Sequence, residues 1–221
     1  SPRFTELVYS DIDEILQIYP LLFSFILFAA SCVKKNVPFN RSIELYHRKS
    51  SLSKNEIDLV INGDLQNQIL ASTLSIANKD ISSLGIYSAC ATFIEGIIIG
   101  SMFVNNTKSN IIVSSSSHNL VSEKQFRFPL ELGNQRPPSS QWTVTGSGSA
   151  ILSKNGTGPF ITHATIGKIV DMGIKDANNM GAAMAPAALD TLITHFKDTE
   201  RNPSYYDAIF TGDLGLVGSG L

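Results

Sequence analysis

Short and long apolar runs alternate along the chain, and this alternation predicts strands and helices in turn. The short runs at 57–62 (IDLVIN) and 110–115 (NIIVSS) have the length and β-branched content of fully buried strands. A longer segment, 84–105, opens with an apolar run and passes through small residues around Cys90. It then continues as a helix-length apolar stretch in which Glu95 is the only charged residue. Between the first two runs, 65–77 has an amphipathic helical pattern.

The same patterns predict elements elsewhere. Acidic residues ahead of Pro20 favour a short helix within the first 20 residues. Further strands are predicted at 23–33, 141–152, 160–170 and 206–211, and further helices at 41–50 and 178–196. Strands and helices alternating at this spacing favour an α/β fold with mostly parallel sheets covered on both faces.

One eight-residue pattern occurs twice. Residues 58–65 read DLVINGDL, and residues 207–214 read DAIFTGDL. Each copy follows a predicted helix and a polar loop, and each is the second strand of its series. The shared setting indicates duplication of an α/β unit.

The segment 15–33 has two interpretations. Its length is close to that of a minimal membrane span, but polar residues and Pro20 interrupt it. The strongly apolar part, 21–30, is closer to the length of a buried strand. No basic region precedes it, so it is not a typical signal peptide. A buried strand and a membrane-associated segment therefore both stay open.

Composition excludes several classes of protein. Charged residues make up 16% of the chain, against about 25% in an average globular domain, which favours close-packed α/β structure. The net charge of -2 gives no basic field for nucleic acid. Two distant cysteines make neither a disulfide framework nor a zinc knuckle. No cluster of histidine and carboxylate residues has metal-ligand spacing, so we expect no metal and no cofactor.

Cys90 has the most promising position for chemistry. A strand that turns sharply through Ser88 and Ala89 into a helix would place the Cys90 sulfur at the helix N-terminus, where the dipole favours a thiolate. The alternative is a free cysteine that packs as a small hydrophobic residue. His118 follows the strand at 110–115 and is either at the same end of the sheet as Cys90 or an ordinary loop histidine. We interpret His47, His163 and His195 as structural residues.

Eight segments together resemble a known family. They are 61–68 (INGDLQNQ), 87–92 (YSACAT), 116–119 (SSHN), 123–129 (EKQFRFP), 141–146 (QWTVTG), 165–173 (TIGKIVDMG), 179–186 (NMGAAMAP) and 211–215 (TGDLG). The chain resembles the stage V sporulation protein AD family, a group with the thiolase and ketoacyl synthase fold. The resemblance covers about 41–215. It implies a first thiolase-like repeat over 1–155, divergent at 1–40, and an incomplete second repeat over 156–221.

The resemblance also implies a function. Family members help to load pyridine-2,6-dicarboxylate (dipicolinate), with calcium, into the developing spore. They work beside membrane-embedded sporulation proteins and bind the ligand without turning it over. The chain is then expected in the cytoplasm or at the periphery of the forespore membrane, as a homodimer paired near 84–88.

A flat aromatic dianion requires cationic donors, helix-start amides and an aromatic wall. The alternative for 123–142 is a set of solvated loop charges and a packed tryptophan, and for Asn179 a helix cap. The expected ligand-binding residues are Cys90, His118, Asn119, Lys124, Arg127, Arg136, Trp142, Asp171 and Asn179.

Two other functions stay open. An acyltransferase would use Cys90 as its nucleophile, but it would also need an activating base and an oxyanion hole. In the relatives that catalyse such reactions, the base comes from histidines on loops of the second repeat, and this chain has no such loops. A structural subunit would instead dock to membrane partners, through 15–33.

Overall fold

A computed structural model describes seven ranges of the chain and three single residues. They are 3–8, 52–65, 68–106, 110–117, 146–155, 159–176, 179–212 and the single residues Leu214, Gly218 and Gly220. The predicted strand at 23–33 and the predicted helix at 41–50 lie outside these residues, as does the possible membrane segment 15–33. None of the described helices is long and apolar enough to cross a membrane.

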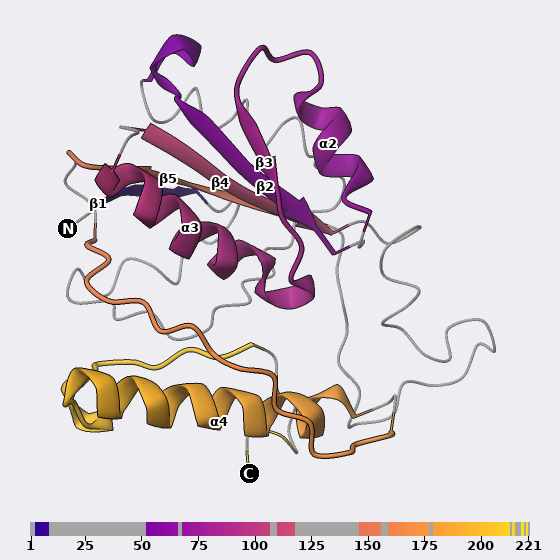
Figure 1. The fold of residues 1–221 in the computed structure, drawn as a ribbon, viewed down its shortest axis with the longest axis vertical. Helices are drawn as coiled ribbons and strands as arrows, with labels where there is room; N and C mark the ends of the chain where they lie inside the picture. Colours follow the sequence, from indigo (N-terminus) through magenta and orange to yellow (C-terminus); the bar gives the residue numbers. More distant parts are fainter. Residues whose placement is uncertain are drawn as a thin grey trace.

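Five strands form one mixed sheet in the order β1-β5-β4-β2-β3 (Figure 1). β2 runs parallel to β4 on one side and to β3 on the other. β5 pairs antiparallel with β4, and β1 pairs antiparallel with β5. The strands are β1 Arg3–Val8, β2 Leu59–Asp64, β3 Ser83–Gly85, β4 Asn110–Ser117 and β5 Gly146–Ser153. The predicted α/β fold is confirmed.

Helices cover the two faces of this sheet, because successive side chains of a strand point to opposite faces. Ile61 belongs to the core shared with α3 (Thr92–Asn106), whereas Val60 belongs to the core that includes Ile76 of α2 (Leu70–Ile76). Both side chains are almost completely buried. β2 is buried along its whole length, as its continuous run of β-branched residues predicted.

Three predictions in the first unit are corrected. The helix predicted within the first 20 residues is wrong over Arg3–Val8, because this backbone pairs with β5 and forms a strand. β2 does not break at Gly63, because Gly63 and Asp64 continue the parallel ladder to β4. The helix predicted from 65 begins only at Leu70.

The described residues from 159 onward contain one long helix. α4 (Met180–Thr199) confirms the predicted helix and lies at the bottom of the view, apart from the sheet (Figure 1). The strands predicted at 160–170 and 206–211 are wrong: the chain there forms no strand beyond an isolated bridge at Phe160. A strand requires a neighbouring backbone, and no described strand lies beside either segment.

A buried histidine joins both of these segments to α4. His195 is fully buried; its Nδ1 lies 2.8 Å from the Thr165 hydroxyl and its Nε2 lies 2.7 Å from the Tyr206 hydroxyl. Burial lowers the pKa of His195, and the positive charge of Arg201 acts in the same direction, whereas Asp198 opposes it. The predicted structural role of His195 is therefore confirmed.

Candidate ligand-binding site

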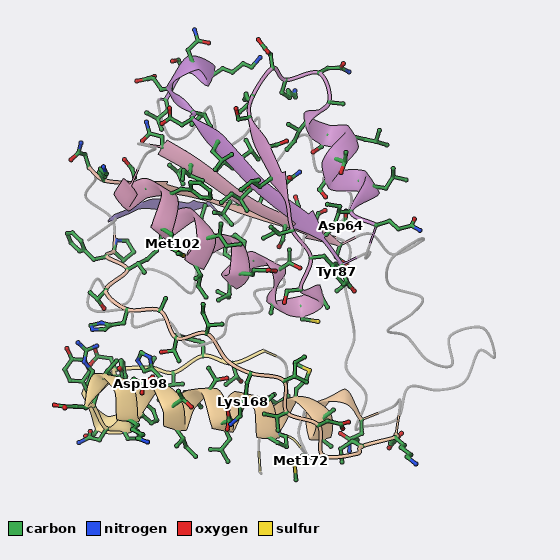
Figure 2. All side chains as sticks on the ribbon, in the orientation of Figure 1. Asp64, Tyr87, Met102, Lys168, Met172 and Asp198 are labelled. Atoms are coloured by element: carbon green, nitrogen blue, oxygen red, sulfur yellow. The ribbon has the colours of Figure 1, made fainter. Side chains whose placement is uncertain are left out.

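The carboxyl ends of three parallel strands define one edge of the sheet. β2 ends at Asp64, β3 leads into Tyr87, and β4 ends at Ser117. Figure 2 shows Asp64 and Tyr87 at this edge, beside the start of α3. Ligands of open α/β sheets bind outside such carboxyl ends, so this edge is the candidate site.

Cys90 lies in a strained turn at this edge. The chain leaves β3, forms the 3-10 turn Ala89–Ala91, and continues directly into α3. Ala89 has a positive φ of 47°, an unusual conformation for a residue with a side chain. The Thr92 hydroxyl stabilises the turn, because it accepts a hydrogen bond from the Ser88 N–H at 3.0 Å and donates one to the Ala89 carbonyl at 2.7 Å. The predicted placement of Cys90 at the start of a helix is confirmed.

Gly63 allows this turn to pack against β2. A Cβ at Gly63 would lie well inside 3.0 Å of the Ile86 carbonyl oxygen and of the Thr92 side chain. The Ile86 N–H also donates a hydrogen bond to the carbonyl of Asn62, the residue before Gly63, at 3.0 Å. Only glycine therefore fits at the end of β2 without moving the Cys90 turn.

Polar contacts between β2 and α2 hold the same edge. The Asp64 carboxylate accepts hydrogen bonds from the Ser72 hydroxyl at 3.0 Å and from the Ser72 N–H at 3.3 Å. The Asn62 side chain donates to the Ser72 carbonyl at 2.8 Å. Asn62, Asp64 and Ser72 are all buried, so these bonds fix the end of β2.

The environment of Cys90 favours a neutral thiol. The residue is exposed, but partial removal of its thiol from water raises the pKa of Cys90. A hydrogen bond with the backbone of Cys90 lowers the pKa by less. Burial therefore outweighs the thiolate-favouring effect that the sequence suggested. Among the hydrogen bonds of the described residues, none joins the Cys90 sulfur to a histidine or a carboxylate.

Two buried polar atoms in the described part of the chain lack a hydrogen-bond partner there: Ser147 Oγ and Glu95 Oε2. Ser147 pairs with Ser116, which in turn pairs with Asp64, so Ser147 lies at the candidate edge. Glu95 lies in the first turn of α3. Buried polar groups in native proteins usually have partners, so an unpaired hydroxyl at this edge is suited to a ligand.

Three of the nine expected site residues are described. Asp171 is exposed and accepts a hydrogen bond from the Gly173 N–H at 2.7 Å. Asn179 caps α4, because its side chain accepts from the Ala182 N–H at 3.2 Å. No hydrogen bond of the described residues joins either of them to Cys90. The other six lie outside the described residues: His118, Asn119, Lys124, Arg127, Arg136 and Trp142.

Sequence reasoning missed Gly63 and Thr92, which support the turn, and Ser147, whose buried hydroxyl lies at the same edge. All three are ordinary residue types without a catalytic pattern. The sequence Gly-Asp-Leu, which occurs at both 63–65 and 212–214, is the feature that could have pointed to a structural role for Gly63. Within the described residues, no group of three metal-ligating side chains is suited to a metal ion.

The fold is identified by comparison with solved structures. An OleA variant from Xanthomonas campestris matches with a TM-score of 0.61 at 9% identity, over 83% of this chain and 62% of that one. AbyA1, a tetronic acid condensing enzyme, matches with a TM-score of 0.52 at 13% identity, over 74% and 57%. At these identities the likeness establishes the fold alone. The fold is that of the thiolase-like condensing enzymes.

The sequence then identifies the family. The family model of stage V sporulation protein AD matches residues 34–221. Stage V sporulation protein AD of Bacillus subtilis (strain 168) is 43% identical over 173 residues, which make up 78% of this chain and 51% of that protein. The chain belongs to the stage V sporulation protein AD family, as the resemblance predicted. It spans about half the length of this curated relative.

Gly63→Ala should destabilise the protein by about 1–3 kcal/mol, because the added methyl group must displace a backbone carbonyl or the Thr92 side chain. Gly148→Ala is the matched control, since nothing lies within 4 Å of a Cβ there. Urea unfolding followed by circular dichroism measures both. Equal stability of the two variants would show that Gly63 does not set the position of the turn.

Cys90 should react with iodoacetamide at a higher pH than an unfolded thiol, because burial raises its pKa. Mass spectrometry of the Cys90 peptide gives the alkylation rate across the pH range, without interference from Cys32. The same peptide in urea-unfolded protein is the control. A folded-state midpoint at or below the unfolded one would contradict a neutral thiol.

Proposed function

We propose that this chain takes part in spore formation by binding dipicolinate at the edge that carries Cys90, without catalytic turnover. Membership of the sporulation family supports the biological setting. The observation that carries the proposal is the position of Cys90 in the turn that leads into α3, at the edge of the sheet that also carries the buried Ser147 hydroxyl.

The described edge has features that a flat aromatic dicarboxylate needs. The N-terminus of a 15-residue helix favours a carboxylate. Tyr87 is partly exposed and offers an aromatic wall, and the Ser147 hydroxyl is available as a donor. A neutral thiol lines such a site without repelling the ligand.

The cationic donors in this proposal come from the polar stretch after β4. Lys124, Arg127 and Arg136 neutralise the two carboxylates, because guanidinium and ammonium groups form charge-assisted bonds with them. Trp142 stacks on the ring, while His118 and Asn119 complete the polar contacts. Asp171 and Asn179 are the last two residues of the proposed contact set.

Calcium fits the same proposal. Glu95 adds a negative charge in the first turn of α3, which opposes a free dianion more than a neutral chelate of calcium and dipicolinate. The chain then binds the chelate better than the free acid. Membrane-embedded sporulation proteins are the proposed partners, and the forespore membrane periphery is the proposed location. The proposed homodimer pairs through β3, an exposed edge strand.

Acyl transfer is the second candidate, and the Cys90 turn itself favours it. A strained strand-to-helix turn presents a thiol at a helix start, and OleA from Xanthomonas campestris has been crystallised with lauric acid and lauroyl-CoA (TM-score 0.55, 12% identity). The raised pKa of Cys90 argues against this candidate, because the thiolate is the nucleophile.

Isothermal titration calorimetry of the 221-residue chain tests the proposal. We expect saturable binding of dipicolinate, strengthened by equimolar calcium, and weaker binding of benzene-1,3-dicarboxylate, which lacks the ring nitrogen. Cys90→Ala should weaken binding by about three- to tenfold without unfolding the protein, about 1 kcal/mol. Met102→Ala, an exposed change farther along α3, is the matched control.

The absence of binding, or equal loss in the control variant, would contradict the proposal. The acyl-transfer candidate has its own readout on the same sample. Incubation with lauroyl-CoA should give no mass increase on the Cys90 peptide, and an acyl adduct there would favour catalysis instead.

A further inference from the structure

A buried histidine joins α4 to two extended segments of the chain. The first extended segment is 159–176, and the second is 201–212. His195 of α4 is fully buried, and each of its ring nitrogens contacts a hydroxyl on one of these segments. Its Nδ1 lies 2.8 Å from the Thr165 hydroxyl in the first segment, and its Nε2 lies 2.7 Å from the Tyr206 hydroxyl in the second. Figure 1 shows the first extended segment running along α4.

The two hydroxyls around the ring are suited to its neutral form. A neutral imidazole has one N–H donor and one acceptor nitrogen, and a hydroxyl can pair with either because it can both donate and accept. When the ring is protonated, both nitrogens donate, so the Thr165 and Tyr206 hydroxyls must both accept. The hydrogen-bond partners of His195 among the described residues are these two neutral groups. Protonation would therefore bury a charge without a carboxylate bonded to it.

Charged groups near His195 lie on all three parts of this interface. Burial is the largest cause that lowers the pKa of His195, and the charges of His163 and Arg201 act in the same direction. Asp198, one turn further along α4, raises it but does not prevail. The Arg201 side chain is held in place, because its guanidinium lies 4.4 Å from the centre of the Tyr205 ring and its Nη1 lies 3.4 Å from Nδ1 of His163.

Two further contacts hold the first extended segment on α4. Lys168 forms an ion pair with Asp190 at 3.0 Å, but the Lys168 side chain is 72% exposed, and exposed ion pairs contribute little. Gly167 lies close to Thr191, because a Cβ at Gly167 would come within 3.0 Å of the Thr191 hydroxyl. Of the described side chains that make these contacts, His195 is the buried one whose ordinary pKa lies near neutral pH.

We propose that His195 is a pH-sensitive switch: its neutral ring holds both extended segments on α4, and its protonation loosens them together. The sign follows from linkage. The pKa of the buried ring is lowered, whereas in the opened state it returns to about 6.5. The interface is therefore most stable above about pH 6.5. Its opening equilibrium rises by up to about tenfold for each pH unit below that value, until the pH reaches the lowered pKa. This inference does not depend on dipicolinate binding.

A thiol introduced beneath the first extended segment measures this opening. Thr191→Cys places it at a buried position of α4 that faces Gly167. Its rate of reaction with 4,4′-dithiodipyridine is divided by the rate of the same thiol in urea-unfolded protein at each pH. Peptide mass spectrometry separates it from Cys32 and Cys90. Because only opened molecules react, lowering the pH from 7.5 to 5.5 should raise the divided rate by about three- to tenfold.

Matched variants show whether His195 causes the rise. His195→Gln keeps a donor and an acceptor but does not titrate, so the divided rate in that background should not change with pH. Ser75→Cys on α2 is the positional control. Like Thr191, Ser75 is buried on a helix and donates its hydroxyl to a carbonyl of its own helix, and its divided rate should not change with pH either. Ala188→Cys, at a second buried position of α4, replaces Thr191→Cys if that variant does not fold.

Two results would overturn the inference. One is a divided rate at Thr191→Cys that is the same at pH 7.5 and 5.5. The other is a rise that persists in His195→Gln or that Ser75→Cys shows equally, since the pH would then act through other groups. If His195→Gln does not fold, an NMR titration of the histidine rings in the unaltered chain decides, and a pKa of His195 at or above 6.5 would contradict the switch. None of these outcomes depends on the calorimetric test with dipicolinate.

Discussion

β2 is the one described strand with parallel ladders on both of its edges, to β3 on one side and to β4 on the other, and all six of its residues are buried. Its two sets of side chains belong to the two cores, one shared with α3 and one shared with α2. Its carboxyl end also fixes the Cys90 turn, because Gly63 lets the Ile86 carbonyl and Thr92 approach closely. Fold and site therefore depend on the same six residues.

Local pattern was sufficient where a segment's structure depends on its own residues. The β-branched run of β2, the apolar stretch of α3 and the Ala-rich α4 were all predicted correctly. β1 was not, because its strand depends on pairing with β5, which lies far away in the sequence. The second copy of the repeat was predicted as a strand because its sequence resembles β2. This prediction was wrong because a strand also requires pairing, which local sequence does not provide. Its side chains are suited to a strand, but the segment is not among the five strands of the described sheet.

For the candidate site too, the sequence predicted the features that depend on local residues and missed those that depend on tertiary contacts. The sequence located Cys90 at a strand-to-helix turn, because small residues between two apolar runs are typical of such turns. It could not give the direction of the pKa shift, which depends on how far the surrounding atoms remove the thiol from water. Nor did it find Thr92, which bonds the turn in three dimensions, or Ser147, whose hydroxyl is buried at the edge without a hydrogen-bond partner among the described residues.

In the proposed function, a thiolase-like fold in which burial raises the pKa of Cys90 serves to bind a ligand. The helix start that would stabilise a thiolate is equally able to hold a ligand carboxylate. Whether Cys90 faces the ligand is the decisive point.

Ligand protection of Cys90 tests this point most directly. The rate of Cys90 alkylation is measured by peptide mass spectrometry while dipicolinate and calcium are titrated into the folded chain, with Cys32 as the internal reference. The account predicts a saturable decrease in the Cys90 rate at the ligand concentrations that give calorimetric binding. An unchanged Cys90 rate at saturating ligand would contradict the placement of the ligand at this edge.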